Sequence, residues 1–68
     1  MRLQYDRETD SLYIHLSEQP SMESEEVADG VVLDFAEDGA LVGIDIENAS
    51  TRTNVAKMIF EQVSADAA

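Results

Sequence analysis

The chain has 68 residues, with 15 acidic side chains against 4 basic ones, a formal charge of −11, and neither cysteine nor tryptophan. This length predicts a single domain over residues 1–68, and the lack of cysteine excludes disulfides, thiolate metal sites and thiol enzymes. Only 22 side chains are large and apolar, and so small a core rarely supplies more than about 3–5 kcal/mol. We therefore expect oligomerisation or a partner to add stability.

The charge is also unevenly placed along the chain. Twelve acids and no lysine or arginine lie between Arg7 and Arg52. Nucleic acids bind to basic surfaces, so the composition argues against a nucleic-acid partner. Two interpretations of the acid excess stay open: a solvated surface that keeps the protein soluble, or a complement to a basic protein. No apolar run has the length of a signal peptide or a membrane helix, which predicts a cytoplasmic protein with no membrane partner.

Residues 1–16 predict a β-hairpin, because their apolar side chains alternate with polar ones. Pairing Tyr5 with Leu12 leaves a loop at 7–10. In this register the apolar side chains share one face, which fixes the pairing. The other face then carries Arg2, Gln4, Tyr13 and His15.

Residues 17–30 contain the only proline and five acids without a helical period. They predict a loop that ends in a short strand near Glu25–Ala28. Asp29 and Gly30 then suit a turn into the next strand.

Residues 31–47 predict a second hairpin. Asp38 and Gly39 suit a two-residue type I′ turn, in which both central residues have positive φ. That turn pairs Phe35 with Val42, Leu33 with Ile44, and Val31 with Ile46, and it places Asp34 opposite Gly43 on the back of the sheet. A glycine inside a strand also suggests a bulge or a close approach by another backbone.

The pattern changes to a helical period from Ser50 onward. Val55, Met58, Ile59 and Val63 predict one amphipathic helix over about 51–63, followed by a frayed tail at 64–68. Packed on the apolar face of strands that cover about 2–47, this helix would complete a two-layer α+β domain with four to five antiparallel strands.

On the back of such a sheet, four side chains would form a patch that a monomer leaves in water. They are Tyr13, His15, Val32 and Leu41. We take them as the candidate interaction face, with a homodimer as the favoured assembly through this face or a sheet edge.

The alternative to an interaction domain is a module that binds a metal ion or a small ligand through clustered carboxylates. Its candidates are Asp6, Glu8, Asp10 and Asp34. The spacing of the first three resembles the start of a calcium loop, but Ser11 and Ser17 stand where an EF-hand needs glycine and glutamate. Turn formation by Asp6 and Asp10 explains the pattern equally simply. We assign no metal ligand and no cofactor.

No arrangement of residues predicts catalysis. His15 is the only histidine, and its expected neighbour across the hairpin is Arg2, which would repel a cation. Asp34 and Asp45 could form a carboxylate pair for acid–base chemistry, but a chain this small has little depth for an enclosed pocket. No catalytic residue is therefore assigned, and we expect no enzyme.

Three stretches of the sequence resemble one known family. They are 5–14 (YDRETDSLYI), 23–27 (ESEEV) and 30–50, with its GVVLDF, EDG and VGIDIENAS segments. The chain resembles the family of small bacterial and archaeal proteins catalogued as domain of unknown function 2283 (DUF2283). The family commonly has tyrosine where Phe35 stands and glutamate where Asp45 stands.

The resemblance implies a compact, mostly β domain and brings no activity, cofactor or catalytic residue. Such small acidic proteins are sometimes encoded beside small toxin-like proteins, which implies an antitoxin-like role. Together with the charge, this leads us to expect a non-enzymatic protein-interaction domain that masks a basic partner.

Overall fold

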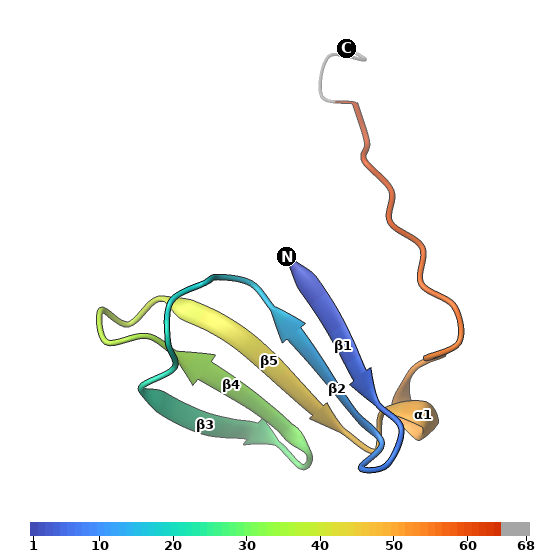
Figure 1. Cartoon of the computed structure of the whole chain (residues 1–68), viewed down its shortest axis with the longest axis horizontal. Helices are drawn as coiled ribbons and strands as arrows, with labels where there is room; N and C mark the ends of the chain where they lie inside the picture. The colour runs from blue at the N-terminus through green and yellow to red at the C-terminus, as the bar shows by residue number, and fades with distance from the viewer. Residues whose placement is uncertain (65–68) are drawn as a thin grey trace.

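The computed structural model of the protein describes residues 1–64 and contains one antiparallel sheet and one short helix (Figure 1). The spatial order of the strands is β1-β2-β5-β4-β3. The elements are β1 (Arg2–Asp6), β2 (Ser11–His15), β3 (Glu23–Ala28), β4 (Val31–Phe35), β5 (Leu41–Glu47) and α1 (Ala49–Arg52). The predicted α+β class and the antiparallel pairing of its strands are confirmed.

The first hairpin has the register that the alternating pattern predicts. Tyr5 pairs with Leu12, and the loop between β1 and β2 spans 7–10. β2 then pairs with β5 in the centre of the sheet, so that Leu12 faces Ile46 and Ile14 faces Ile44. The two hairpins therefore join through their apolar strands.

The second hairpin differs from the prediction at its turn. The amide of Gly39 donates to the carbonyl of Ala36, and Gly39 has a φ of 87°. The turn is thus a three-residue loop that ends in a left-handed glycine, which is a common alternative to the two-residue type I′ turn. Leu33 still pairs with Ile44, but a bulge pairs Phe35 with Leu41, so the predicted Phe35–Val42 pair is wrong.

The strand predicted near Glu25–Ala28 is β3, and it begins earlier, at Glu23. It pairs with β4 at the outer edge of the sheet, with a register shift between Glu26 and Ala28. The turn at Asp29 and Gly30 is confirmed, and Gly30 has a φ of 78°. All residues of β3 are exposed.

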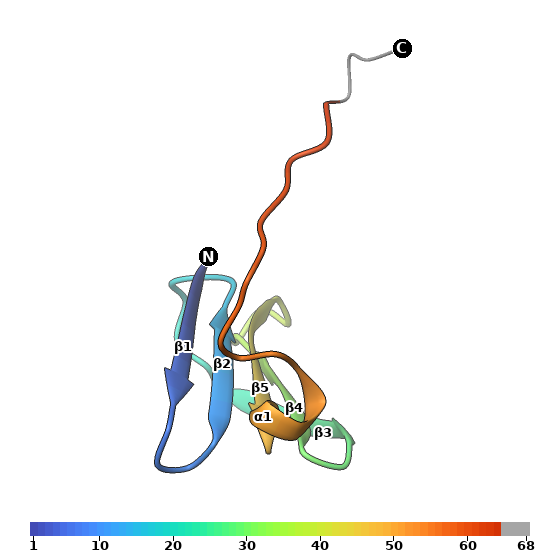
Figure 2. The ribbon, with the colours of Figure 1, turned by 90° about the vertical axis from the view of Figure 1, so that its right-hand side faces the viewer.

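The predicted helix over 51–63 is wrong. The helix α1 has 4 residues and ends at Arg52, and the next residue, Thr53, adopts an extended conformation. Residues 53–64, here called the C-terminal segment, contain one turn near Val55. They otherwise run without regular structure, first past β1 and β2 and then beyond the sheet (Figures 1 and 2). A helix of the predicted length, over 51–63, is marginal in water without a surface to pack on. The tail expected at 64–68 lies, from residue 65 on, outside the described residues.

Without that helix, residues 1–64 form no second layer on the sheet. The buried apolar residues are Ala36, Val42 and Ala49, and no large side chain of the described chain is fully buried. The short α1 lies at one end of the sheet, next to the loop between β1 and β2 (Figure 1). Within residues 1–64, no helix is long and apolar enough to cross a membrane.

Candidate interaction surfaces

A hydrogen-bonded network crosses the polar face of the sheet. The hydroxyl of Tyr13 on β2 donates to Oδ2 of Asp34 on β4 over 2.6 Å. The hydroxyl of Ser24 on β3 donates to the other oxygen of the same carboxylate, also over 2.6 Å. The network therefore links β2, β4 and β3 across the strand that lies between β2 and β4.

Gly43 on β5 makes this crossing possible. A Cβ atom at Gly43 would overlap the hydroxyl of Tyr13, so the aromatic ring lies directly over the glycine. The sequence suggested a bulge or a close approach by another backbone at this position, and the bulge does follow directly, between the Asp34–Gly43 and Phe35–Leu41 pairs. The group that approaches Gly43 is a side chain of the same chain, Tyr13, rather than another backbone.

The carboxylate changes the acidity of the phenol. The hydrogen bond from the Tyr13 hydroxyl to Asp34 raises the pKa of Tyr13 to about 12, with burial and the charge of Asp45 as further causes. Tyr13 also contacts His15, with ring centroids 4.5 Å apart in an edge-on arrangement. His15 is in turn hydrogen-bonded to Gln4 on β1. Tyr13 is thus held by its neighbours on several sides.

Three of the four residues of the candidate interaction face lie together. Tyr13 and His15 on β2 and Val32 on β4 occupy the polar side of the sheet on either side of β5, because Tyr13 and Val32 both pair with Asp45. The bulge pairs Leu41 with Phe35, so the register groups Leu41 with the apolar side instead. Tyr13, His15 and Val32 therefore form a small, hydrogen-bonded surface, and its role in binding stays a prediction.

The candidate carboxylates are spread over different contacts. Asp6 accepts hydrogen bonds from the amides of Glu8 and Thr9, which confirms its predicted role in the turn. Asp34 lies on β4 and accepts the hydrogen bond from Tyr13. Among residues 1–64, no group of three or more histidine and carboxylate side chains is placed to hold a metal ion.

Asp10 has a role that the sequence did not indicate. Its carboxylate accepts from the amide and hydroxyl of Ser50 in α1 and from the hydroxyl of Tyr5, with distances between 2.6 and 3.0 Å. These bonds lower the pKa of Asp10, the bond from Tyr5 most, and that bond raises the pKa of Tyr5. Asp10 therefore anchors α1 to the first hairpin. The signal available in the sequence was an aspartate at a turn position that needs positive φ, here 54°.

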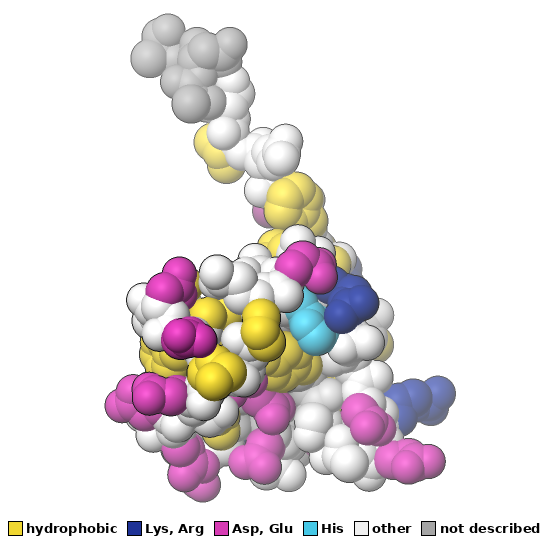
Figure 3. Space-filling view, turned by 60° about the vertical axis from the view of Figure 1, so that its left-hand side comes forward, with side chains coloured by type: hydrophobic (Ala, Val, Ile, Leu, Met, Phe, Trp, Pro, Cys, Tyr) yellow, Lys and Arg dark blue, Asp and Glu magenta, His cyan; other side chains and the backbone are white. Residues whose placement is uncertain are grey.

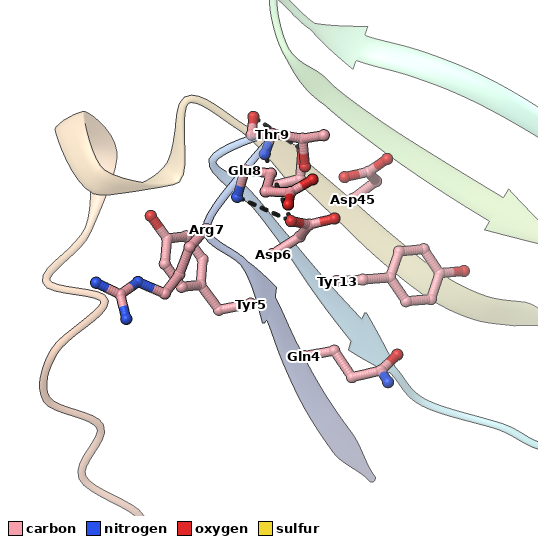
Figure 4. A pocket seen from close by; sticks show the side chains of 9 residues that line it. Gln4, Tyr5, Asp6, Arg7, Glu8, Thr9, Tyr13 and Asp45 are labelled. Atoms are coloured by element: carbon pink, nitrogen blue, oxygen red, sulfur yellow. Dashed lines mark hydrogen bonds between the residues drawn. The ribbon is translucent and has the colours of Figure 1, made fainter.

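A depression of about 600 Å³ lies beside the loop between β1 and β2 (Figure 4). Asp6, Glu8 and Asp45 line it, together with Tyr13 and Gln4. One carboxylate oxygen of Asp45, Oδ1, is buried without a hydrogen-bond partner among the described residues. The depression is open and shallow, and Asp45 itself is only half-buried.

The opposite face of the sheet is apolar and lacks a covering layer. Two rows of side chains cross four strands on this face. They are Leu3, Ile14, Ile44 and Leu33 in one row and Tyr5, Leu12, Ile46 and Val31 in the next. None of these eight residues is buried. We call this surface the apolar face.

The C-terminal segment passes the β1–β2 end of the apolar face without sealing it. Depressions of about 430 and 540 Å³ remain between this segment and the strands. Met58, Ile59 and Phe60 border them and are still 65%, 68% and 66% exposed. Both partners of a hydrophobic contact are therefore present in one chain, yet the apolar face stays only half-buried and the side chains of the segment stay mostly in water.

The acids form the surroundings of these faces. β3, the outer strand, carries Glu23, Glu25 and Glu26, all exposed. Figure 3 shows acidic side chains spread across this face of the molecule, while lysine and arginine appear only on the right of the view. The acid excess in the sequence is thus a property of the folded surface.

The comparisons with known proteins identify a family and no characterised relative. The family described as "Protein of unknown function (DUF2283)" matches residues 2–50. No curated protein and no solved structure matches the chain. The matched range covers the whole sheet and ends inside α1, so the C-terminal segment lies beyond it.

Proposed function

The chain belongs to the DUF2283 family, and from the surfaces of this member we propose a non-enzymatic protein-interaction domain. The observation that carries the proposal is the apolar face, whose eight side chains are all half-buried or exposed. Contiguous apolar patches of this kind are rare on monomeric soluble proteins and mark sites of association. Burial of such a patch is favourable by about 25 cal/mol for each Å² removed from water.

The acidic surface supports a basic protein as a partner. Like charges at an interface cost free energy, and opposite charges speed the encounter and select the partner. With Glu23, Glu25 and Glu26 along the outer strand, the chain would attract and mask a basic surface in an antitoxin-like manner. This part of the proposal also fits the charge of −11.

The polar face supports a binding role rather than a catalytic one. Tyr13 and Asp34 satisfy each other's hydrogen bonds, and the raised pKa of Tyr13, about 12, keeps the phenol protonated at neutral pH. A general base needs a pKa near the operating pH and access to its substrate. The depression beside this network is shallow and open to solvent.

A capture experiment with charge variants tests the basic partner. Tagged full-length protein would be used to capture partners from its native host at low salt, and the bound material would be eluted with high salt. The variant Glu23→Gln/Glu25→Gln removes two charges from β3, and Glu18→Gln/Glu37→Gln removes two exposed charges elsewhere. We expect a near-stoichiometric basic protein that salt releases and that the β3 variant retains less well than the control. Equal retention by both variants, or no such protein, contradicts this part of the proposal.

A further inference from the structure

We infer that a second copy of this chain covers the apolar face, with the C-terminal segment of each copy lying across the sheet of the other. The inference rests on the proposed function, because it names the occupant of the surface that carries that function. Three properties of the chain select a second copy over another occupant. They are its exposed area, the distribution of its charges and the course of its C-terminal segment.

The exposed area matches that of one half of a stable dimer. The chain exposes 5426 Å², whereas a compact folded monomer of its mass exposes about 4200 Å². The radius of gyration is 14.0 Å, against about 11 Å for a compact chain of this length. The excess of roughly 1200 Å² per copy corresponds to a dimer interface of about 2400 Å², which is in the range of obligate homodimers.

Repulsion between the acidic surfaces favours the apolar face as the surface through which two copies meet. Each copy carries −11, so contact between acidic surfaces is opposed by repulsion. The two rows of side chains on the apolar face contain no charged residue over four strands, and a charge enters the first row only at the outer edge, where Glu25 on β3 pairs with Leu33. A two-fold axis would bring this face against itself, and such an interface is closed, so neither copy keeps an open apolar face.

The C-terminal segment is the part that can extend onto the partner. It leaves α1, passes the β1–β2 end of the sheet and continues beyond it (Figures 1 and 2). The side chain of Val63 is 91% exposed. Exchange of such a segment between two copies is a common route to a dimer.

The sequence of this segment fits a helix that forms upon docking. Val55, Met58, Ile59 and Val63 have helical spacing, although the segment is not helical in the isolated chain. A short helix gains most of its stability from packing its apolar side on another surface. The partner sheet supplies that surface, and the dimer would therefore acquire the second layer that the monomer lacks.

Sedimentation equilibrium of the full-length protein tests the assembly. We expect a mass twice the 7.5 kDa of the chain and a dissociation constant that falls as salt is raised, because salt screens the repulsion between the copies. The variant Met58→Gln/Ile59→Gln should raise that constant by about a hundredfold, since two large apolar side chains lose their burial.

The matched control is Met22→Gln/Val27→Gln, which makes two apolar-to-glutamine changes outside the apolar face. Met22 and Val27 are 60% and 51% exposed, so both double variants should keep the folded circular dichroism spectrum. We expect the control to leave the dissociation constant unchanged. An equal loss of dimer in both variants, or a monomer at all concentrations, overturns the inference.

Nuclear Overhauser effects in a mixture of isotope-labelled and unlabelled copies test the exchange. We expect contacts between the methyl groups of Ile59 in one copy and Ile14 or Ile44 in the other. A dimer without these contacts overturns the inference. A monomer whose apolar face instead binds a basic host protein overturns it too, but leaves the proposed function standing.

Discussion

Tyr13 on β2 and Asp34 on β4 are joined by a hydrogen bond of 2.6 Å that passes over the strand between them. Because β5 presents Gly43 at the crossing point, the ring of Tyr13 fills the space where a side chain would stand. The first hairpin and the second are therefore tied by a side-chain contact as well as by the backbone ladder. This contact organises the polar face.

Removal of the phenolic hydroxyl should weaken the fold without dismantling it. We expect Tyr13→Phe to lower the free energy of unfolding by about 1–3 kcal/mol, because a half-buried carboxylate loses a donor. Urea denaturation followed by circular dichroism would measure the change. Ser24→Ala, which removes a more exposed donor to the same carboxylate, should cost less. A larger cost for Ser24→Ala would contradict this account of the network.

Alkaline pH should break the hydrogen bond between Tyr13 and Asp34. The pKa of Tyr13 is raised from 10.0 to about 12 in the folded protein. A raised folded-state pKa contributes stability that is fully present below pH 10.0 and is lost as the pH rises through about 12. An absorbance titration of tyrosinate should therefore show a late-titrating group in the native chain. In Tyr13→Phe the component near 12 should disappear, which leaves only Tyr5, whose pKa its bond to Asp10 also raises. A titration in which Tyr13→Phe loses no component near 12 would refute the assignment.

A methyl group at Gly43 should be poorly tolerated. In Gly43→Ala the new Cβ would overlap the ring of Tyr13, so the ring must move and its bond to Asp34 must lengthen. Overpacking of this kind costs about 1–3 kcal/mol. The cost should fall sharply in a Tyr13→Ser background, where the space above the glycine is empty. An equal cost in both backgrounds, measured by urea denaturation, would show that the ring is not the obstacle.

Acid should loosen the contact between α1 and the first hairpin. Hydrogen bonds from Tyr5 and Ser50 lower the pKa of Asp10 below its ordinary value of 3.8. The stability that this gives is therefore present above that ordinary value and is lost as the pH falls through the lower, folded-state pKa. Asp10→Asn should remove this acid-dependent component and keep the left-handed backbone conformation, which asparagine tolerates. Equilibrium unfolding at several pH values would measure it, and identical acid profiles for both proteins would contradict the role given to Asp10.

The strands and most of their register were predictable because local patterns fix them. A one-residue slip in the first hairpin would move Leu12 and Ile14 to the other face, so the alternation alone specifies the pairing. At the second turn two loop geometries compete for the same Asp38-Gly39 sequence. The loop that forms changes the partner of one residue, because Phe35 pairs with Leu41 rather than with Val42.

The contacts between distant residues were less predictable. The sequence singled out Gly43 but could not identify Tyr13 as the group above it, since this depends on the order of strands in the sheet. The helix over 51–63 was predicted from spacing alone. Spacing indicates which side of a helix would be apolar, whereas formation of the helix depends on a surface to pack against, and the isolated chain leaves Met58 and Ile59 exposed.

The central claim is that the apolar face of a single chain is open and becomes covered only through association. The most direct test is methyl NMR of isoleucine-labelled protein with a soluble paramagnetic agent, recorded on a dilute and on a concentrated sample. Our account predicts that the methyl signals of Ile14, Ile44 and Ile46 are broadened by the agent in the dilute monomer and protected in the associated state. Protection of these three methyl groups in a chain that stays monomeric would contradict it, because the face would then be covered from within the same chain.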